Sequence, residues 1–314
     1  MRALLLLTAL SFIGGFSFGQ ETKPKKFYLE TIGGYGFPLV NDDLGSTDEL
    51  IGIADRLVRA DSSISIKPAQ GTQGPGWQFS LNAGYMFHPN IGVEAQISYL
   101  KSNPILIGRN VSPTFQAEHV VVGERVDIAP QLVFSFPIKE KWSLYSKSGV
   151  IIPIWGRSKS EITIKDQEGR VFESLIGIPN PNVSADVRIS ASTFGKFSYG
   201  FQTRLGAGYA ALNWLTVFAE VKFVALTIRS KEDRADDINV QFYNSQTGEP
   251  GLLITEDDVD EIEQRTIFVN ELTENSNNPE VNPNSDSSKP LEDLMRKDNF
   301  NQLALSFGLR FYIR

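Results

Sequence analysis

The segment QLALSFGLRFYI, residues 302–313, sorts its side chains into two kinds by position. Its odd positions are all large and apolar: Leu303, Leu305, Phe307, Leu309, Phe311 and Ile313. Its even positions are small or polar and include Gln302, Ser306 and Arg310. Because side chains alternate faces along a β-strand, one face of this strand is expected to be wholly apolar. A soluble β-sandwich also alternates, but it rarely places an arginine and a glutamine among such small residues.

The same two-residue period recurs in seven further segments. They are residues 27–37, 77–85, 91–99, 125–134, 142–154, 197–209 and 215–223, of which 27–37 and 142–154 fit least cleanly. Together with residues 303–313 they make eight candidate strands, an even number, as single-chain bacterial barrels have.

The connectors between these segments alternate in length. Tight turns follow Phe87, Phe136 and Ala210, whereas residues 40–76, 101–123, 156–195 and 229–299 form long connectors. Short turns at one end and long loops at the other are typical of membrane barrels, as are aromatic residues near strand ends. The sequence therefore predicts an all-β chain, an eight-stranded antiparallel transmembrane β-barrel with long extracellular loops that can continue the barrel upward.

The composition excludes several other classes of protein. Mean hydropathy is −0.16, and a helical membrane protein needs about 20 apolar residues in a row for each span. The net charge of −7 argues against a nucleic-acid partner. Without cysteines the chain has no disulfide, no thiolate nucleophile and no lipid anchor on an N-terminal cysteine. With His88 and His119 as its only histidines, a histidine-rich metal centre is excluded, and we expect no cofactor.

The N-terminus has the features of a secretory signal. Arg2 is followed by the apolar stretch 3–13, and the small residues Ser17 and Gly19 stand at the −3 and −1 positions of a cleavage site before Gln20. A membrane anchor is the alternative, but the apolar stretch is too short for one. We therefore expect a signal peptide at residues 1–19 and a barrel domain at residues 20–314.

With this signal, the eight alternating segments and the aromatic Phe311 and Tyr312 near its end, the chain resembles the small outer-membrane barrels of Gram-negative bacteria, of the OmpA-barrel and OmpX type. The resemblance covers nearly the whole mature chain. It implies a location in the bacterial outer membrane, contact with outer-membrane lipid, and recognition of the strand from Leu303 to Arg314 by the barrel-assembly machinery. The chain ends in Arg314 rather than phenylalanine, and no peptidoglycan-binding domain follows, so the anchoring role of full-length OmpA is not implied.

Charged residues fall on the predicted inward faces in nearly balanced numbers. They are Glu30, Glu94, Asp127 and Glu220 against Arg125, Lys147, Arg204, Lys222 and Arg310. The interior of an eight-stranded barrel is just wide enough for its own side chains, and unpaired charges there cost several kcal/mol each. We therefore expect a lumen polar network that plugs the barrel, rather than a charged, gated pore.

The long connectors contain further patterns. Residues 46–58 combine a capping box with helical spacing of apolar residues, which predicts a helix. Two hairpins are predicted, at residues 160–175 around the turn 166–169 and at residues 237–255 around the turn 245–248. Residues 256–263 are strongly acidic; Ca²⁺ binding is conceivable, but EF-hand spacing is missing, which favours a solvated acidic face.

Three functions remain open. The first is a structural or surface-interaction barrel whose loops bind an unknown partner, and inward polar pairs favour it. The second is a narrow channel or transporter for small or hydrophobic solutes, which a continuous hydrophobic path into the lumen would favour. The third is an enzyme, which would need His119 poised beside a serine or carboxylate at the outer rim. His88 lies in a predicted turn at the opposite end, and we assign no catalytic residue.

Overall fold

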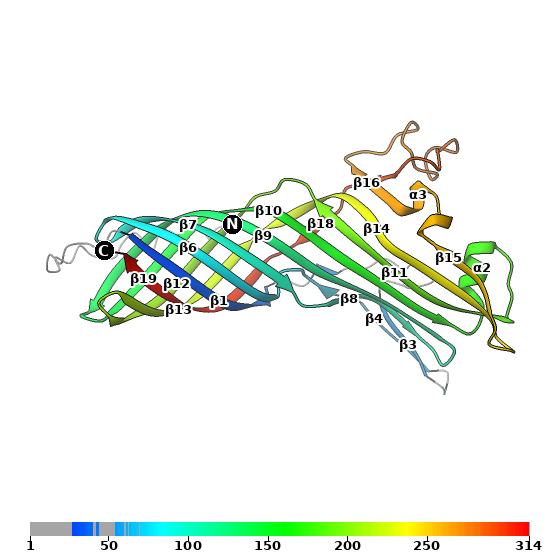
Figure 1. Cartoon of the computed structure of the whole chain (residues 1–314), viewed down its shortest axis with the longest axis horizontal. Coiled ribbons are helices and arrows are strands. Elements are labelled where there is room, and N and C mark those ends of the chain that lie inside the picture. Colours follow the sequence, from blue (N-terminus) through cyan, green and yellow to red (C-terminus); the bar gives the residue numbers. More distant parts are fainter. Residues whose placement is uncertain are drawn as a thin grey trace.

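The computed structural model describes residues 27–39, 42–43, 54–59, 61, 63–68 and 70–313 of the 314. The molecule is elongated, with a ring of strands at one end and a long sheet extending from it at the other (Figure 1). Within the described residues, no helix is long and apolar enough to cross a membrane. The predicted signal peptide lies outside these residues and stays a prediction.

Antiparallel pairing closes the ring of strands. Its members, in order around the ring, are β1 (Phe27–Pro38), β6 (Gly76–His88), β7 (Ile91–Ser102), β9 (Phe115–Lys139), β10 (Trp142–Asp166), β12 (Gly200–Leu212), β13 (Leu215–Ala225) and β19 (Gln302–Ile313). The last strand pairs with the first from Phe27↔Ile313 to Pro38↔Gln302, so the described residues form a closed ring of eight strands. The ring is antiparallel and all-β, as predicted.

Side chains alternate across the ring wall as the sequence pattern predicts. On β19, Leu305 and Phe307 are 45% and 61% exposed on the outer face, whereas Ser306 and Arg310 are buried in the lumen. Close packing fixes the register at lumen glycines, because a Cβ at Gly206 would collide with the ring of Tyr145. The outer face is therefore apolar and exposed, and the inner face is polar.

The three tight turns lie at one end of the ring. They join His88 to Ile91, Lys139 to Trp142 and Leu212 to Leu215, close to the predicted positions. Phe27 and Ile313 lie at this same end, because β1 starts and β19 ends there. We call it the turn end, and the opposite end of the ring the loop end.

At the loop end the long connectors are built largely of strand. Strands β9 and β10 have 25 residues each, more than twice the 9–11 residues that a tilted strand needs to cross a bilayer. Their outer halves pair with β8 (Ile105–Val111) and β11 (Val183–Gly195), and β11 pairs with β14 (Thr227–Asn244). This continuous sheet, which we call the extension, projects beyond the ring (Figure 1).

The extension has a hydrophobic core of its own. Its buried residues are Phe115, Ala117, Ile164, Val171, Ala185, Val187, Ile238, Val240 and Phe242. Helix α2 (Arg170–Ile176) covers this core, with the ring of Phe172 packed edge-on against Phe242 at 5.6 Å. The apolar side chains of residues 162–164 and 238–242 are buried in this second core and not against lipid. This burial explains why these residues form strands outside the ring.

One hairpin prediction is wrong and the other is confirmed. Strand β10 ends at Asp166, and its carboxylate accepts hydrogen bonds from the backbone amides of Glu168 at 2.8 Å and Val171 at 2.7 Å. These bonds begin helix α2, so Val171 lies in a helix and not in a returning strand. The hairpin at 237–255 is present as β14 and β15 (Pro250–Thr255), paired at Gln241↔Leu253.

The helix predicted at residues 46–58 is wrong where the structure describes it. Residues 54–58 form strand β3 (Ala54–Val58), which pairs with β4 (Ile64–Pro68) and runs parallel to β8. Pairing with β4 on one side and β8 on the other outweighs the local helical spacing of apolar residues there. Residues 46–53 lie outside the described part of the chain. The remaining elements are β2 (Asp42–Asp43), β5 (Gln70–Gly71), η1 (Glu256–Asp258), α3 (Glu261–Gln264), β16 (Arg265–Val269), β17 (Leu291–Leu294) and β18 (Lys297–Asn299).

Candidate functional site in the lumen

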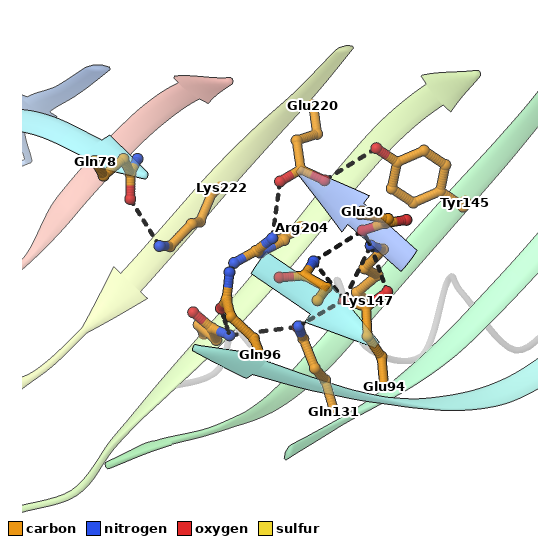
Figure 2. Close-up of polar contacts among 12 residues, drawn as sticks. Glu30, Gln78, Glu94, Gln96, Gln131, Tyr145, Lys147, Arg204, Glu220 and Lys222 are labelled. Atoms are coloured by element: carbon orange, nitrogen blue, oxygen red, sulfur yellow. Dashed lines mark hydrogen bonds and ion pairs between the residues drawn. The ribbon is translucent and has the colours of Figure 1, made fainter. Parts of the chain in front are cut away.

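All nine charged residues expected on inward faces lie buried inside the ring. Each of these residues is at most 4% exposed. They are Glu30, Glu94, Arg125, Asp127, Lys147, Arg204, Glu220, Lys222 and Arg310. They come from seven of the eight ring strands, and β6 adds the neutral Gln78 and Asn82. Figure 2 shows most of them converging on two carboxylate clusters.

The first cluster is centred on Lys147 of β10. Its Nζ lies 2.5 Å from Glu30 Oε2 and 2.8 Å from Glu94 Oε2, so one ammonium bridges two carboxylates. The other oxygen of Glu30 accepts a 2.7 Å hydrogen bond from Arg310 Nε. Each charge in this cluster therefore faces an opposite charge, which offsets the cost of removing it from water.

Neutral donors complete the first cluster. Asn82 Nδ2 donates to Glu30 and to Glu94, both at 2.8 Å. Tyr28 OH and Gln131 Nε2 donate to the two oxygens of Glu94 at 2.8 and 2.9 Å. These neutral donors were not among the predicted network residues. Their inward positions in the two-residue period are the signal that could have found them.

The second cluster joins Arg204 of β12 to Glu220 of β13. Arg204 Nη1 lies 3.0 Å from Glu220 Oε1, and Tyr145 OH donates to Glu220 Oε2 at 2.9 Å. Arg204 Nη2 also donates to Gln96 Oε1, and Gln202 Nε2 donates to the same oxygen at 2.9 Å. Side chains from β7, β10, β12 and β13 thus meet across the lumen.

A third group lies nearer the loop end. Arg125 Nε lies 2.9 Å from both oxygens of Asp127, and its guanidinium stacks over the ring of Phe300 at 4.9 Å. Lys222 Nζ donates to Gln78 Oε1 at 2.7 Å. In Figure 2 this last pair stands apart from the two carboxylate clusters.

Apolar layers lie at both ends of the polar network. At the loop end the buried cluster is Leu100, Ala129, Ile151, Val224, Leu226, Ile228 and Phe300. At the turn end Tyr28, Met86 and Val133 pack together, with Tyr312 against them. Side chains of the ring thus occupy its interior at the loop end, in the middle and at the turn end.

His119 lies outside the ring, on the inner face of the extension. Its Nε2 is 2.6 Å from Ser160 Oγ on the neighbouring strand. Burial lowers the pKa of the His119 imidazole from its usual 6.5, and the positive charge of Arg296 lowers it further. The imidazole is therefore neutral at pH 7 and able to accept a proton. His88 lies exposed at the turn end, where its Nδ1 accepts a hydrogen bond from the Asn90 amide.

The acidic segment 256–263 uses part of its charge locally. Asp258 Oδ2 accepts hydrogen bonds from the backbone amide and the hydroxyl of Thr255, both at 2.9 Å, which caps η1. These bonds hold the pKa of the Asp258 carboxyl below its usual 3.8. Across the described residues, no group of three or more His, Cys, Asp or Glu side chains could hold a metal ion.

Comparison with known proteins gives one family and several distant structures. A family model for the outer membrane protein beta-barrel domain matches residues 3–245. Neisserial surface protein A is 9% identical, with 91% of this chain and 97% of that chain covered and a TM-score of 0.33. OprG from Pseudomonas aeruginosa is 11% identical, with 93% and 98% covered and a TM-score of 0.37.

Outer Membrane Protein W of E. coli is 11% identical, with 93% of this chain and 100% of that chain covered and a TM-score of 0.29. Identities and TM-scores this low carry no argument about function. No curated protein matches the sequence.

Proposed function

Because the chain belongs to the outer membrane protein beta-barrel family and lies in the bacterial outer membrane, we propose that it is a closed, non-enzymatic barrel that presents its extension as an interaction surface. The observation that supports this proposal is the buried polar network, in which the single ammonium of Lys147 bridges two carboxylates. A membrane channel needs a water column, and the interior of a ring this small is already occupied by side chains.

Planar-bilayer recording of the purified protein tests the closed lumen. We expect small or absent conductance from the unmodified protein. Arg204→Ala removes the partner of Glu220 and should raise the conductance or destabilise the barrel. Arg188→Ala is the matched control, because Arg188 is exposed on the extension, and it should change neither property. Large, stable channels from the unmodified protein would show that the lumen is open.

The extension supports the interaction role. Loops tied into a sheet with its own buried core hold their exposed side chains in fixed positions, which reduces the entropy lost when a partner binds. The partner is unknown. We further propose that lipid contacts the outer apolar face and that the assembly machinery recognises strand β19. We also propose that the chain is exported and that its signal peptide is cleaved before Gln20. The mass of the N-terminal peptide from the membrane fraction tests the last point.

A channel or transporter for small or hydrophobic solutes is the second candidate. The apolar cluster around Phe300 at the loop end is the feature that favours it. Directly below this cluster stand Arg125 and Lys222, so the apolar path does not continue through the ring. Solute-dependent conductance or vesicle uptake would support this candidate against the closed barrel.

An enzyme is the third candidate, and the 2.6 Å contact between His119 and Ser160 is the observation in its favour. A serine nucleophile needs such a base, but the base is normally oriented by a third group. In the described part of the chain, no carboxylate accepts a hydrogen bond from His119. We therefore expect Ser160 to stay unlabelled by a fluorophosphonate probe, and labelling that His119→Gln abolishes would establish the enzyme.

A further inference from the structure

The charges inside the ring do not balance. Among the described lumen residues, five basic side chains face four carboxylates. Glu30, Glu94, Asp127 and Glu220 each form an ion pair with Lys147, Arg310, Arg125 or Arg204. No carboxylate of the described residues forms an ion pair with Lys222. Lys222 is therefore the basic side chain of this set that forms no ion pair with a carboxylate.

Lys222 is deeply buried, with 3% of the residue exposed. The hydrogen-bond partner of its Nζ is Gln78 Oε1 at 2.7 Å, a neutral amide oxygen. Figure 2 shows this contact as a single dashed line away from the carboxylates. A buried ammonium without a counter-charge is strongly destabilising, so a second partner of negative charge is expected close to it.

The surroundings of Lys222 are rich in buried donors without partners among the described residues. These donor atoms are Gln78 Nε2, Gln302 Nε2, Arg125 Nη1 and Ser98 Oγ. The carboxylate of this group, Asp127, is already bonded through both oxygens to Arg125 Nε. One acceptor of the same group, Gln302 Oε1, is also without a partner, so these four donors outnumber the free acceptor. An acceptor that bears negative charge would satisfy the remaining donors.

Strand pairing brings these donors to one level of the ring. Gln302 pairs with Val224, two residues from Lys222, and its side chain lies against Gly36 of β1. Gln78 pairs with Gly34 of the same strand. Gln302 therefore lies between the strands that carry Lys222 and Gln78.

Arg125 approaches the same group from β9, which is separated from β6 by β7. It pairs with Leu100, which in turn pairs with Gln78. Its guanidinium lies over Phe300, two residues before Gln302. The apolar cluster that includes Val224 and Phe300 covers this level on the loop side, and the Arg204–Glu220 pair lies on the turn side.

We propose that this level of the lumen binds one small monovalent inorganic anion of the size of chloride, held by Lys222 Nζ and Arg125 Nη1. The amides of Gln302 and Gln78 supply the remaining donors. A monatomic anion is the smallest occupant that supplies this charge, and the interior of an eight-stranded ring is little wider than its own side chains. The anion completes the charge balance of the closed barrel and does not require that the barrel conduct.

The test is the anion dependence of thermal unfolding of the full mature chain refolded in lipid vesicles. Ionic strength is held constant while chloride replaces gluconate, which is too large for the lumen. A specific site predicts saturable stabilisation, with the ratio of folded to unfolded protein rising about a hundredfold at a chloride concentration 100 times Kd. A melting temperature that does not depend on chloride would overturn the proposal.

Two further measurements locate the ion. Lys222→Met removes the uncompensated charge and should abolish the chloride dependence, whereas Lys159→Met, at an exposed lysine of the extension, should keep it. Equal chloride dependence in both variants would place the ion elsewhere and refute the site. Crystals grown in bromide should show an anomalous peak beside Lys222 in the unmodified protein, a result that does not depend on either variant folding. A water molecule with no anomalous signal at this position would show that Lys222 is neutral or solvated, and it would overturn the proposal.

Discussion

Replacement of Lys147 by methionine is the sharpest test of the polar lumen. Methionine nearly preserves the length and volume of the side chain but removes the charge that lies 2.5 Å from Glu30 and 2.8 Å from Glu94. Glu30 keeps its ion pair with Arg310 at 2.7 Å. Glu94 is left with three neutral donors and no cation, so Lys147→Met creates one unpaired buried carboxylate.

Breaking a buried ion pair by removing one partner costs about 3–5 kcal/mol. The hydrogen bonds that Glu94 retains from three neutral donors bring the expected loss toward about 3 kcal/mol, which is roughly a hundredfold in the unfolding equilibrium. Glu94→Gln in the Lys147→Met background removes the stranded charge. That double variant should recover at least about 2 kcal/mol, since a buried pair replaced as a whole costs little.

Urea unfolding from lipid vesicles, followed by the fluorescence of the four tryptophans, measures these losses. The matched control is Lys159→Met, at an exposed position of the extension, where a change within about 0.5 kcal/mol is expected. A loss below about 1 kcal/mol for Lys147→Met would refute the reasoning. So would a double variant less stable than the single one, because the stranded charge would then not be the cause.

Three further predictions follow from exposed fractions, ion pairs and pKa. Leu305 and Leu253 are both 45% exposed, but Leu305 lies on the apolar outer face of the ring and Leu253 lies on β15. Leu305→Arg should cost about 2–4 kcal/mol, as expected for a position proposed to face lipid, and Leu253→Arg within about 0.5 kcal/mol in the same refolding assay. Arg204→Ala should lower the urea midpoint by stranding Glu220, and Glu220→Gln added to it should restore part of the loss. The pKa of His119 is lower in the folded protein than in the unfolded chain, so its contribution to stability is present above about pH 6.5 and is lost as pH falls from that value toward the folded pKa. Arg296→Gln removes a positive charge near the imidazole and should raise this pKa, as measured by NMR titration.

The two-residue period was sufficient to place every charged lumen residue on the inner face. A strand has only two faces, and a shift by one residue would put Arg204 or Glu220 into lipid, so the facing is decided locally. The long connectors were harder to interpret. The apolar residues of β10 beyond the ring, such as Ile164, show the same period as those inside it, but they are buried by α2 and β14 rather than by lipid. Nothing in the local pattern distinguishes these two environments.

Two assignments of helix and strand were wrong because hydrogen bonds, which the apolar pattern does not contain, decide the structure there. Residues 54–58 have helical spacing, but pairing with β4 and β8 makes them a strand. Val171 fits a hairpin by pattern, but the Asp166 carboxylate binds its amide and begins a helix. For residues 54–58, hydrogen bonds to neighbouring strands outweigh the preference of the segment itself, whereas for Val171 a hydrogen bond within the predicted hairpin decides.

By itself the sequence determined the class of fold, the end of the ring where the turns lie and the composition of the lumen, because each of these follows from the spacing of neighbouring residues. Only the tertiary structure decided which charges meet. Arg204 finds Glu220 only 16 residues away on the next strand, whereas Lys222 meets Gln78, 144 residues away across the lumen. Arg204 and Lys222 both point inward by the same two-residue period. Arg204 forms an ion pair with a carboxylate, whereas Lys222 forms a hydrogen bond to a neutral amide. That difference depends on the register of strands distant in the sequence, which a local pattern does not contain.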